Sequence, residues 1–254
     1  MTDKWVYQDY ILKDQDFIER HKTHYQRYVK NIRESDQHLI RIVGELLEQK
    51  PAEADQLKLL DVGCNTGNLL LHLRAAYPEM HLSGVDISDD MIELCKSNEA
   101  LGGMDFEVLN IIKSKPQNMF DCVVLNAVIF SWDSTDLSEA LENIYLSLKD
   151  DGWLVIFDLF TPFKHNLTVM EQSELYPNGV ALHIRSYDSS EQLFKEKSFS
   201  DVSFFPFSLS VDLTKAPDDF DVVRSHTVRT KDGLGLSFRG GLFQPWCHVV
   251  VQKY

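Results

Sequence analysis

The sequence of 254 residues is long enough for one large α/β domain with a well-buried core. Two full domains of half this length would each have only a small core. Its apolar fraction of 44% is that of an ordinary globular protein, and it lacks the run of about 18 apolar residues that a membrane-spanning helix requires. The net charge of −14 opposes binding to a polyanion, so we expect no nucleic acid partner.

The N-terminal segment, residues 1–50, has the pattern of a helical cap. Apolar residues recur at steps of three and four between Leu39 and Leu47, which is typical of an amphipathic helix. Charged residues interrupt the first twenty positions, so this segment does not have the pattern of a secretory signal. We therefore expect a cytoplasmic protein without a membrane partner.

The central segment, residues 51–160, alternates short apolar runs with amphipathic helices, which is typical of a parallel sheet built from βαβ units. The expected strands are 59–62, 81–85, 106–109, 122–125 and 153–157. The expected helices between them are 69–76, 91–98 and 137–148. The pattern predicts an α/β fold of the Rossmann-like kind.

The C-terminal segment, residues 161–254, follows a different pattern. Ser189 and Ser190 offer an N-cap for a short helix that runs to Lys197, and a terminal strand is expected at 247–251. Three further segments, 180–187, 221–230 and 234–238, have the spacing of an antiparallel β ribbon. We expect this insertion to form a lid over a substrate.

The ribbon supplies candidates for contacts with a substrate. Alternation places His183 and Arg185 on one face of its first strand, and His226 alternates likewise in the second. His165, just past the fifth strand, is a further candidate base on position alone. These candidates form the predicted catalytic set. The solvated face of an exposed ribbon would explain the same pattern.

A glycine-bounded turn joins the first strand of the central segment to a helix. Gly63 and Gly67 allow the backbone to approach a ligand closely and leave the helix N-terminus free to bind it. The second strand ends at Asp86, where a carboxylate can accept hydrogen bonds from ribose hydroxyls. Together they predict a site for a ribonucleoside, although a tight structural turn alone would also require the glycines.

The turn has the spacing G-x-x-x-G, which differs from the G-x-G-x-x-G that holds a pyrophosphate. It resembles the first motif of class I S-adenosylmethionine-dependent methyltransferases, in which an acid between two apolar residues precedes a glycine-rich turn. Asn65 stands where that family often has its central glycine, and asparagine tolerates left-handed backbone well. The resemblance implies S-adenosyl-L-methionine as the cofactor.

The resemblance extends over about residues 55–160. Residues 86–91 look like the second motif, 109–111 the segment at the adenine edge, and 120–128 the strand end at the methyl-transfer centre. The resemblance implies one methyltransferase domain over 1–254, with a seven-stranded, mostly parallel sheet covered by helices on both faces. The implied cofactor-binding residues are Asp61, Gly63, Cys64, Asn65, Gly67, Asp86, Ile87, Asn110, Ile111 and Asn126, with Tyr28 and Arg33 from the N-terminal helices.

Several of these residues also have plain structural interpretations. Asp61 would serve equally as a helix cap or a core acid, Cys64 as a small packing residue, and Asn126 as a hydrogen-bonding group at the strand end. Tyr28 would serve as a packing residue. The cysteines are scattered without a CxxC pair, so we predict no metal site.

The sequence thus predicts a methyltransferase for a small polar molecule, methylated on oxygen or nitrogen. Arginines beyond residue 180 suggest that the acceptor carries a carboxylate or phosphate. Two alternatives remain open, namely a tRNA- or protein-modifying enzyme with the same cofactor, and a non-catalytic cofactor-binding or scaffold protein. The oligomeric state is also left open, a homodimer included.

Overall fold

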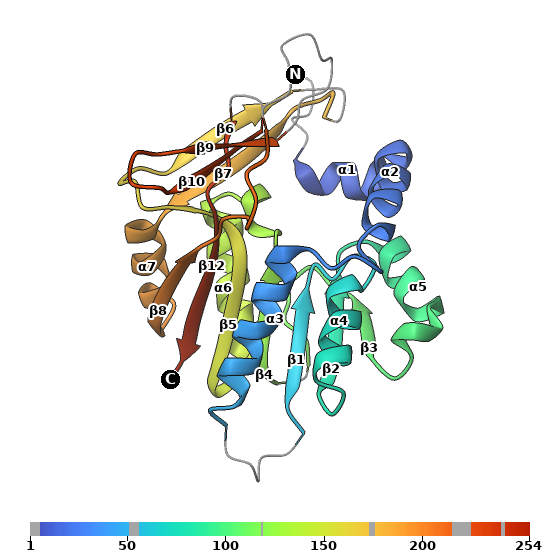
Figure 1. Ribbon diagram of the computed structural model, residues 1–254. Coiled ribbons are helices and arrows are strands. Elements are labelled where there is room, and N and C mark those ends of the chain that lie inside the picture. The colour runs from blue at the N-terminus through green and yellow to red at the C-terminus, as the bar shows by residue number, and fades with distance from the viewer. Residues whose placement is uncertain (1–5, 51–55, 118, 173–175, 215–224, 240–241) are drawn as a thin grey trace.

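The computed structural model describes residues 6–50, 56–117, 119–172, 176–214, 225–239 and 242–254 (Figure 1). Residues 221–224, the start of one predicted ribbon strand, lie outside this description. The central sheet has the strand order β3-β2-β1-β4-β5-β12-β8. These strands are β1 (Lys58–Val62), β2 (His81–Asp86), β3 (Asp105–Val108), β4 (Phe120–Asn126), β5 (Leu148–Thr161), β8 (Phe199–Pro206) and β12 (Trp246–Lys253).

The first five strands of the sheet run parallel, and β12 lies antiparallel between β5 and β8. The predicted mostly parallel, Rossmann-like sheet is therefore confirmed. The order reverses at β1, because the chain goes outward to β2 and β3 and then returns to β4 on the other side. Ligands of open α/β sheets bind beyond the carboxyl ends of the strands at such a point.

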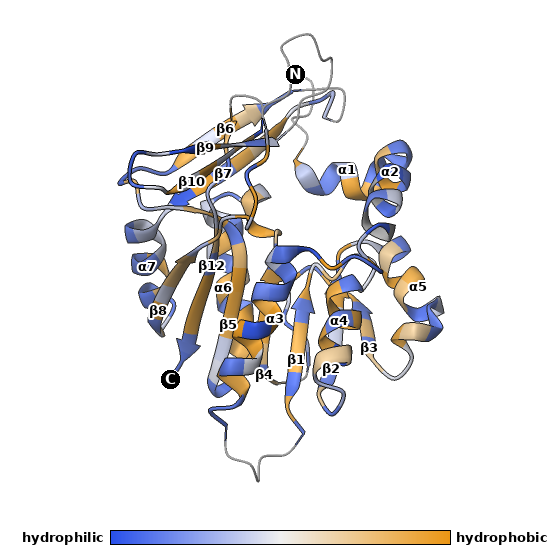
Figure 2. Cartoon of the chain, in the orientation of Figure 1, coloured by the Kyte–Doolittle hydropathy of each residue, from blue (hydrophilic) through white to orange (hydrophobic). Residues whose placement is uncertain are grey.

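Helices cover both faces of this sheet, as predicted. They are α3 (Glu34–Leu47), α4 (Asn68–Ala76) and α5 (Asp89–Ser97) on one face, and α6 (Ser134–Ser147) and α7 (Tyr187–Glu196) on the other. Alternate residues of β4 serve the two faces, since Val124 packs with α3 to α5 and Leu125 packs with α6. Figure 2 shows apolar residues along the central strands and hydrophilic ones on the outer sides of the helices.

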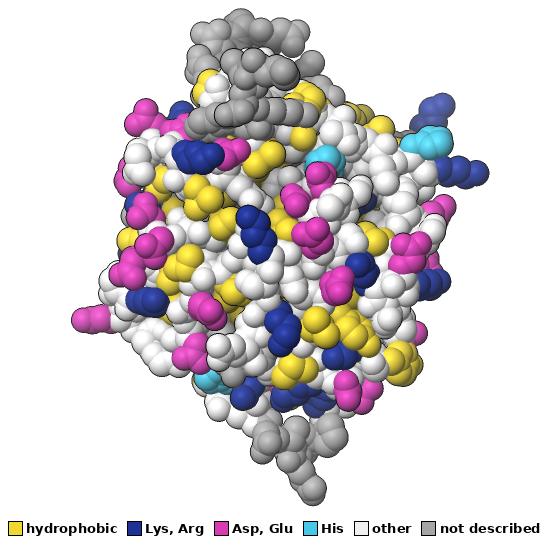
Figure 3. Space-filling model, turned by 180° about the vertical axis from the view of Figure 1, so that it is seen from behind, with side chains coloured by type: hydrophobic (Ala, Val, Ile, Leu, Met, Phe, Trp, Pro, Cys, Tyr) yellow, Lys and Arg dark blue, Asp and Glu magenta, His cyan; other side chains and the backbone are white. Residues whose placement is uncertain are grey.

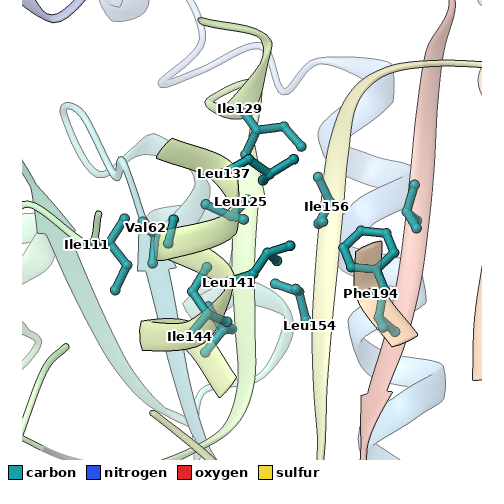
Figure 4. Packing of buried hydrophobic residues seen from close by; sticks show 14 of the residues in the cluster. Val62, Ile111, Leu125, Ile129, Leu137, Leu141, Ile144, Leu154, Ile156 and Phe194 are labelled. Carbon is teal, nitrogen blue, oxygen red and sulfur yellow. The ribbon is translucent and has the colours of Figure 1, made fainter. Parts of the chain in front are cut away.

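The core between β4, β5 and α6 is made of aliphatic side chains. Leu125, Leu141 and Ile156 are fully buried, and Figure 4 shows them between the two strands and the helix. Burying one such side chain contributes about 1.5–3 kcal/mol relative to exposure. This packing fixes the end of β4, from which the chain enters the functional site.

The insertion after β5 is more elaborate than the sequence suggests. Its strands are β6 (Leu167–Glu171), β7 (Val180–Ser186), β9 (Ser225–Arg229), β10 (Gly235–Arg239) and β11 (Leu242–Phe243). Instead of one ribbon there are two units, because β7 pairs with β6 and with β5, whereas β9, β10 and β11 form a separate sheet. The strand β6 was not predicted. The N-cap of α7 is Ser186, so the expected cap at Ser189 or Ser190 is wrong.

Two short helices, α1 (Tyr7–Lys13) and α2 (Gln15–Gln26), lie above the carboxyl ends of the strands (Figure 1). An aromatic cluster joins them to the insertion, with Tyr10 and Phe17 packed against Tyr176 and Leu182. The Tyr10 hydroxyl donates to the Gly179 carbonyl at 3.2 Å. Within the described part of the chain, no helix is long and apolar enough to cross a bilayer.

Candidate cofactor and acceptor site

The turn after β1 is the most sharply bent backbone of the site. Gly63, Asn65 and Gly67 have left-handed φ angles of 74°, 52° and 76°. A Cβ atom at Gly63 would lie 2.8 Å from a methyl group of Val128. Asparagine is among the few non-glycine residues that adopt this conformation readily, so Asn65 can replace the usual glycine.

Asp86 braces this turn from the end of β2. Its carboxylate accepts the Asn65 amide at 2.9 Å and the Ser88 amide at 2.9 Å. Burial raises the pKa of Asp86 even though these hydrogen bonds favour the ionised form. Because a carboxylate offers about four acceptor positions, the side chain can still accept hydrogen bonds from a ligand.

A second group of charges lies on the other side of the turn. Arg33 donates twice to Asp36, at 2.8 and 3.0 Å, and the Asn126 amide donates to the same carboxylate at 3.0 Å. Burial, reinforced by the charges of Asp36 and Asp86, raises the pKa of Asp61 to about 8. A cation bound at this corner of the site would favour the ionised form of Asp61, so the corner suits a positively charged group of a ligand.

Three buried side-chain oxygen atoms among the described residues have no hydrogen-bond partner, namely those of Thr66, Ser83 and Asn126, and two of the three belong to residues that line this hollow. The two are Oγ1 of Thr66 and Oδ1 of Asn126. Buried polar atoms are normally paired, so these two are expected to contact a ligand. Together with the brace at Asp86 and the acids near Arg33, they fit a cofactor with a ribose at one end and an ammonium group at the other.

The hollow, together with the open solvent at its mouth, occupies about 990 Å³. Its wall is formed by Tyr7, Gln8 and Ile11 of α1, by Tyr28 and Arg33, by residues 61–66, 68, 69, 86, 87, 109–112 and 126–128, and by Ser131 and Trp132.

Nearly all predicted cofactor-binding residues line this pocket. They are Tyr28, Arg33, Asp61, Gly63, Cys64, Asn65, Asp86, Ile87, Asn110, Ile111 and Asn126. Gly67 is not part of the wall and instead caps the N-terminus of α4. The structure thus brings eleven of the twelve predicted residues together, although their contacts with a cofactor stay predictions.

The four predicted catalytic residues are not in the wall of this pocket. His165 is exposed between β5 and β6, and His183 faces Thr168 across the β6–β7 pair at 3.2 Å. His226 stacks on Phe238 in the separate sheet, with ring centroids 5.5 Å apart. Arg185 is buried and donates to backbone carbonyl groups.

The insertion was predicted to form a lid over a substrate, and its described strands do not line this pocket. The described residues that close the pocket come from α1 and from the segment after β4, whereas the insertion packs behind α1. The residue pattern could not show this, because an exposed ribbon and a supporting ribbon have the same alternation.

Several residues in the pocket wall or in contact with it were missed from the sequence. Asp36 follows Arg33 by three residues, a spacing at which side chains meet on a helix, and this pairing was the available signal. Tyr7 and Trp132 belong to segments without a motif, and only the folded chain places them at the pocket. Cys64 lines the pocket, but hydrogen bonding to Cys95 and burial raise the pKa of its thiol, which supports a packing role over a nucleophile.

Comparison with known proteins places the chain in a family. A model of the methyltransferase domain matches residues 53–198, more than half of the chain. The chain therefore belongs to this methyltransferase family, and the predicted resemblance to class I S-adenosylmethionine-dependent methyltransferases is confirmed.

Individual relatives agree with the assignment. A malonyl-[acyl-carrier protein] O-methyltransferase of Acetivibrio thermocellus is 30% identical over 60% of this chain and 51% of its own length. A solved S-adenosylmethionine-dependent methyltransferase from Clostridium acetobutylicum has a TM-score of 0.59 at 12% identity, covering 93% of this chain and 98% of that one.

A further structural neighbour is 1,6-didemethyltoxoflavin-N1-methyltransferase from Burkholderia thailandensis, with a TM-score of 0.57 at 14% identity and coverage of 94% and 85%. At such identities these structures show that the fold is shared. The chain spans about half the length of the curated relatives it matches, or somewhat less.

Proposed function

We propose that this protein transfers a methyl group from S-adenosyl-L-methionine to a small polar molecule. Its family membership makes S-adenosyl-L-methionine the cofactor. The observation that carries the proposal is a single pocket in which Asp86, the acid of the second motif, braces the glycine turn and the unpartnered Asn126 oxygen lines the wall.

Different residues of the pocket suit the two ends of the cofactor, the nucleoside and the methionine. The Asp86 carboxylate is placed to accept the ribose hydroxyls, with Ile87 and Ile111 as apolar neighbours for the base. The acids Asp36 and Asp61 favour the ammonium group, and Arg33 favours the carboxylate of the methionine end. When bound, the cofactor supplies a methyl group on an activated leaving group.

The described pocket wall supplies few ionisable groups that could act on an acceptor. Apart from the two tyrosines, the ionisable side chains of the described pocket wall are Arg33, Asp61 and Asp86, together with the Cys64 thiol. Catalysis by alignment and exclusion of water therefore suits this wall better than removal of a proton by histidine. We infer an acceptor whose oxygen or nitrogen is already nucleophilic, such as a carboxylate or a neutral amine.

The names of the relatives are compatible with this inference. One is a malonyl-[acyl-carrier protein] O-methyltransferase and another is a 1,6-didemethyltoxoflavin-N1-methyltransferase. A polyanionic acceptor is less favoured, because Lys and Arg side chains on the face seen in Figure 3 are scattered among acidic ones.

Calorimetric titration with S-adenosylmethionine, S-adenosylhomocysteine and NAD tests the cofactor. Binding of the first two without NAD is expected, and binding of NAD alone would overturn the proposal. Labelled S-adenosylmethionine is then incubated with carboxylic acids, amines, phenols and bulk tRNA. Transfer to a small acid or amine supports the proposal, whereas transfer to tRNA, or binding without any transfer, favours one of the two alternatives.

A further inference from the structure

Two buried charged residues lie behind the acceptor side of the pocket. Arg185 of β7 is 7% exposed and Asp158 of β5 is 1% exposed, and neither lines the pocket. We infer that Asp158 and Arg185 are positioning residues that hold the segment 127–132 in place as a wall of the acceptor site. This inference rests on the proposed function, since it assigns how the acceptor is presented.

The two residues bind complementary backbone groups of that segment: Arg185 binds carbonyl groups and Asp158 binds amide groups. The Arg185 guanidinium donates to the Ile129 carbonyl at 2.8 Å and to the Trp132 carbonyl. The Asp158 carboxylate accepts the Ile129 amide at 2.8 Å and also the Phe130 amide. Both polar backbone groups of Ile129 are therefore held by side chains from other strands.

The segment is poorly stabilised by regular structure. It begins at Ala127, which has a left-handed φ of 58° although it is not glycine, and it continues as the single 3₁₀ turn η2 (Ile129–Ser131). A single turn leaves most of its carbonyl and amide groups without partners inside the turn. The charged pair binds several of these groups in a buried region, where unpaired polar groups are costly.

The same segment forms the part of the pocket wall that follows β4, and we assign this part, the acceptor side, to the methyl acceptor. Val128, Ser131 and Trp132 line the pocket, and Val128 lies so near the glycine turn that a Cβ atom at Gly63 would be 2.8 Å from it. The Phe130 ring packs edge-on against Tyr7 of α1, with centroids 5.2 Å apart. A shift of this segment therefore moves the acceptor wall and the helix above it together.

Arg185 also gives the insertion a role in the site. The strand β7 pairs with the end of β5, with Phe160 opposite Arg185, so the guanidinium approaches the segment from the insertion. The sequence predicted Arg185 on a substrate-binding face. In the structure its guanidinium instead donates to backbone carbonyl groups of segment 127–132. Arginine suits this task because its planar fork can donate to two carbonyls at once, which lysine does with less geometric control.

The test compares Arg185→Met and Arg185→Lys with Lys253→Met. Lys253 is a matched control, because it is also 7% exposed and donates to two backbone carbonyls, those of Tyr145 and Leu148, away from the pocket. Each variant is labelled with 5-fluorotryptophan, and the Trp132 resonance is assigned with Trp132→Phe. Hydrogen exchange of segment 127–132, thermal stability and S-adenosylhomocysteine affinity are measured in parallel.

Arg185→Met is expected to accelerate amide exchange in segment 127–132 by about tenfold or more and to shift the Trp132 resonance. Arg185→Lys is expected to show an intermediate change, and it keeps the test valid should the methionine variant fail to fold. Lys253→Met should lower thermal stability without changing the Trp132 resonance. The KM for the acceptor found in the panel should rise in the Arg185 variants, with cofactor affinity within about threefold of the wild type.

Unchanged exchange and an unchanged Trp132 resonance in both Arg185 variants would overturn the inference. An equal change in Lys253→Met would do the same, because it would reveal a global effect. Failure of the proposed function is a separate outcome, in which the wild type itself does not bind S-adenosylhomocysteine.

Discussion

The two sides of the pocket are built in different ways. The cofactor side consists of strand ends and one turn, and its brace joins Asn65 to Asp86, only 21 positions later. The acceptor side is held by contacts between distant segments, such as Arg185 with Ile129, 56 positions apart, and Tyr10 with Gly179, 169 positions apart. A cofactor site of local origin can thus stay constant while remote segments define the acceptor.

The largest effect on cofactor affinity is expected at the brace of the cofactor side. Asp86→Ala should weaken S-adenosylhomocysteine binding by about 1–3 kcal/mol, or about 5- to 150-fold, because charge-assisted hydrogen bonds are lost. Calorimetry measures the change in Kd. Asp89→Ala removes an exposed acid three positions along and should leave Kd unchanged. Equal affinities of Asp86→Ala and Asp89→Ala for S-adenosylhomocysteine would contradict the proposal that Asp86 binds the ribose.

The next effect concerns the pH dependence of stability. Burial raises the pKa of Asp61 from 3.8 to about 8, so its contribution to stability is present below about pH 4 and is lost as the pH rises towards 8. The loss has a limiting slope of about 1.4 kcal/mol per pH unit.

Asp61→Asn should therefore flatten the pH dependence and stabilise the cofactor-free protein at pH 8, at the expense of cofactor affinity. Urea unfolding at pH 5, 7 and 9 measures this, with the exposed Asp188→Asn as a control. Parallel pH profiles for Asp61→Asn and the wild type would contradict the assignment of the slope to this buried acid.

A smaller effect is expected where the two sides touch. Gly63→Ala introduces a Cβ atom 2.8 Å from a Val128 methyl group at a left-handed φ of 74°. The cost should be about 1–2 kcal/mol of unfolding free energy, together with weaker cofactor binding. Denaturant unfolding measures the first effect. Gly233→Ala, also at a left-handed φ but with nothing within 4 Å, separates backbone strain from the clash.

The smallest effect belongs to the support of the acceptor side. Tyr10→Phe removes a buried hydroxyl that donates to the Gly179 carbonyl and accepts the Asn178 amide at 2.9 Å. The expected cost is about 1 kcal/mol, with faster amide exchange in α1. Tyr254→Phe removes a hydroxyl from a residue that is 70% exposed and should be neutral. Unchanged amide exchange in α1 would contradict the conclusion that the hydrogen bonds between Tyr10 and the insertion stabilise this helix.

The contrast also explains what the sequence could predict. The strands around Gly63 and Asp86 were predicted because their signals lie within a few residues of one another, in apolar runs, glycines and a terminal acid. The support for the acceptor wall was missed, because nothing near Arg185 in the sequence indicates that its partner is the Ile129 carbonyl. Strand β6 was missed because its side chains are mostly exposed and its alternation is weak.

The brace between Asp86 and the Asn65 amide has a consequence for the affinity and the release of the cofactor. Since the carboxylate already fixes the turn before any ligand enters, little conformational entropy remains to be lost on docking. The site for the nucleoside end of the cofactor is thus preorganised for binding. The residence time of the spent cofactor should then depend on how often α1, which lies over the pocket on its aromatic contacts, undocks.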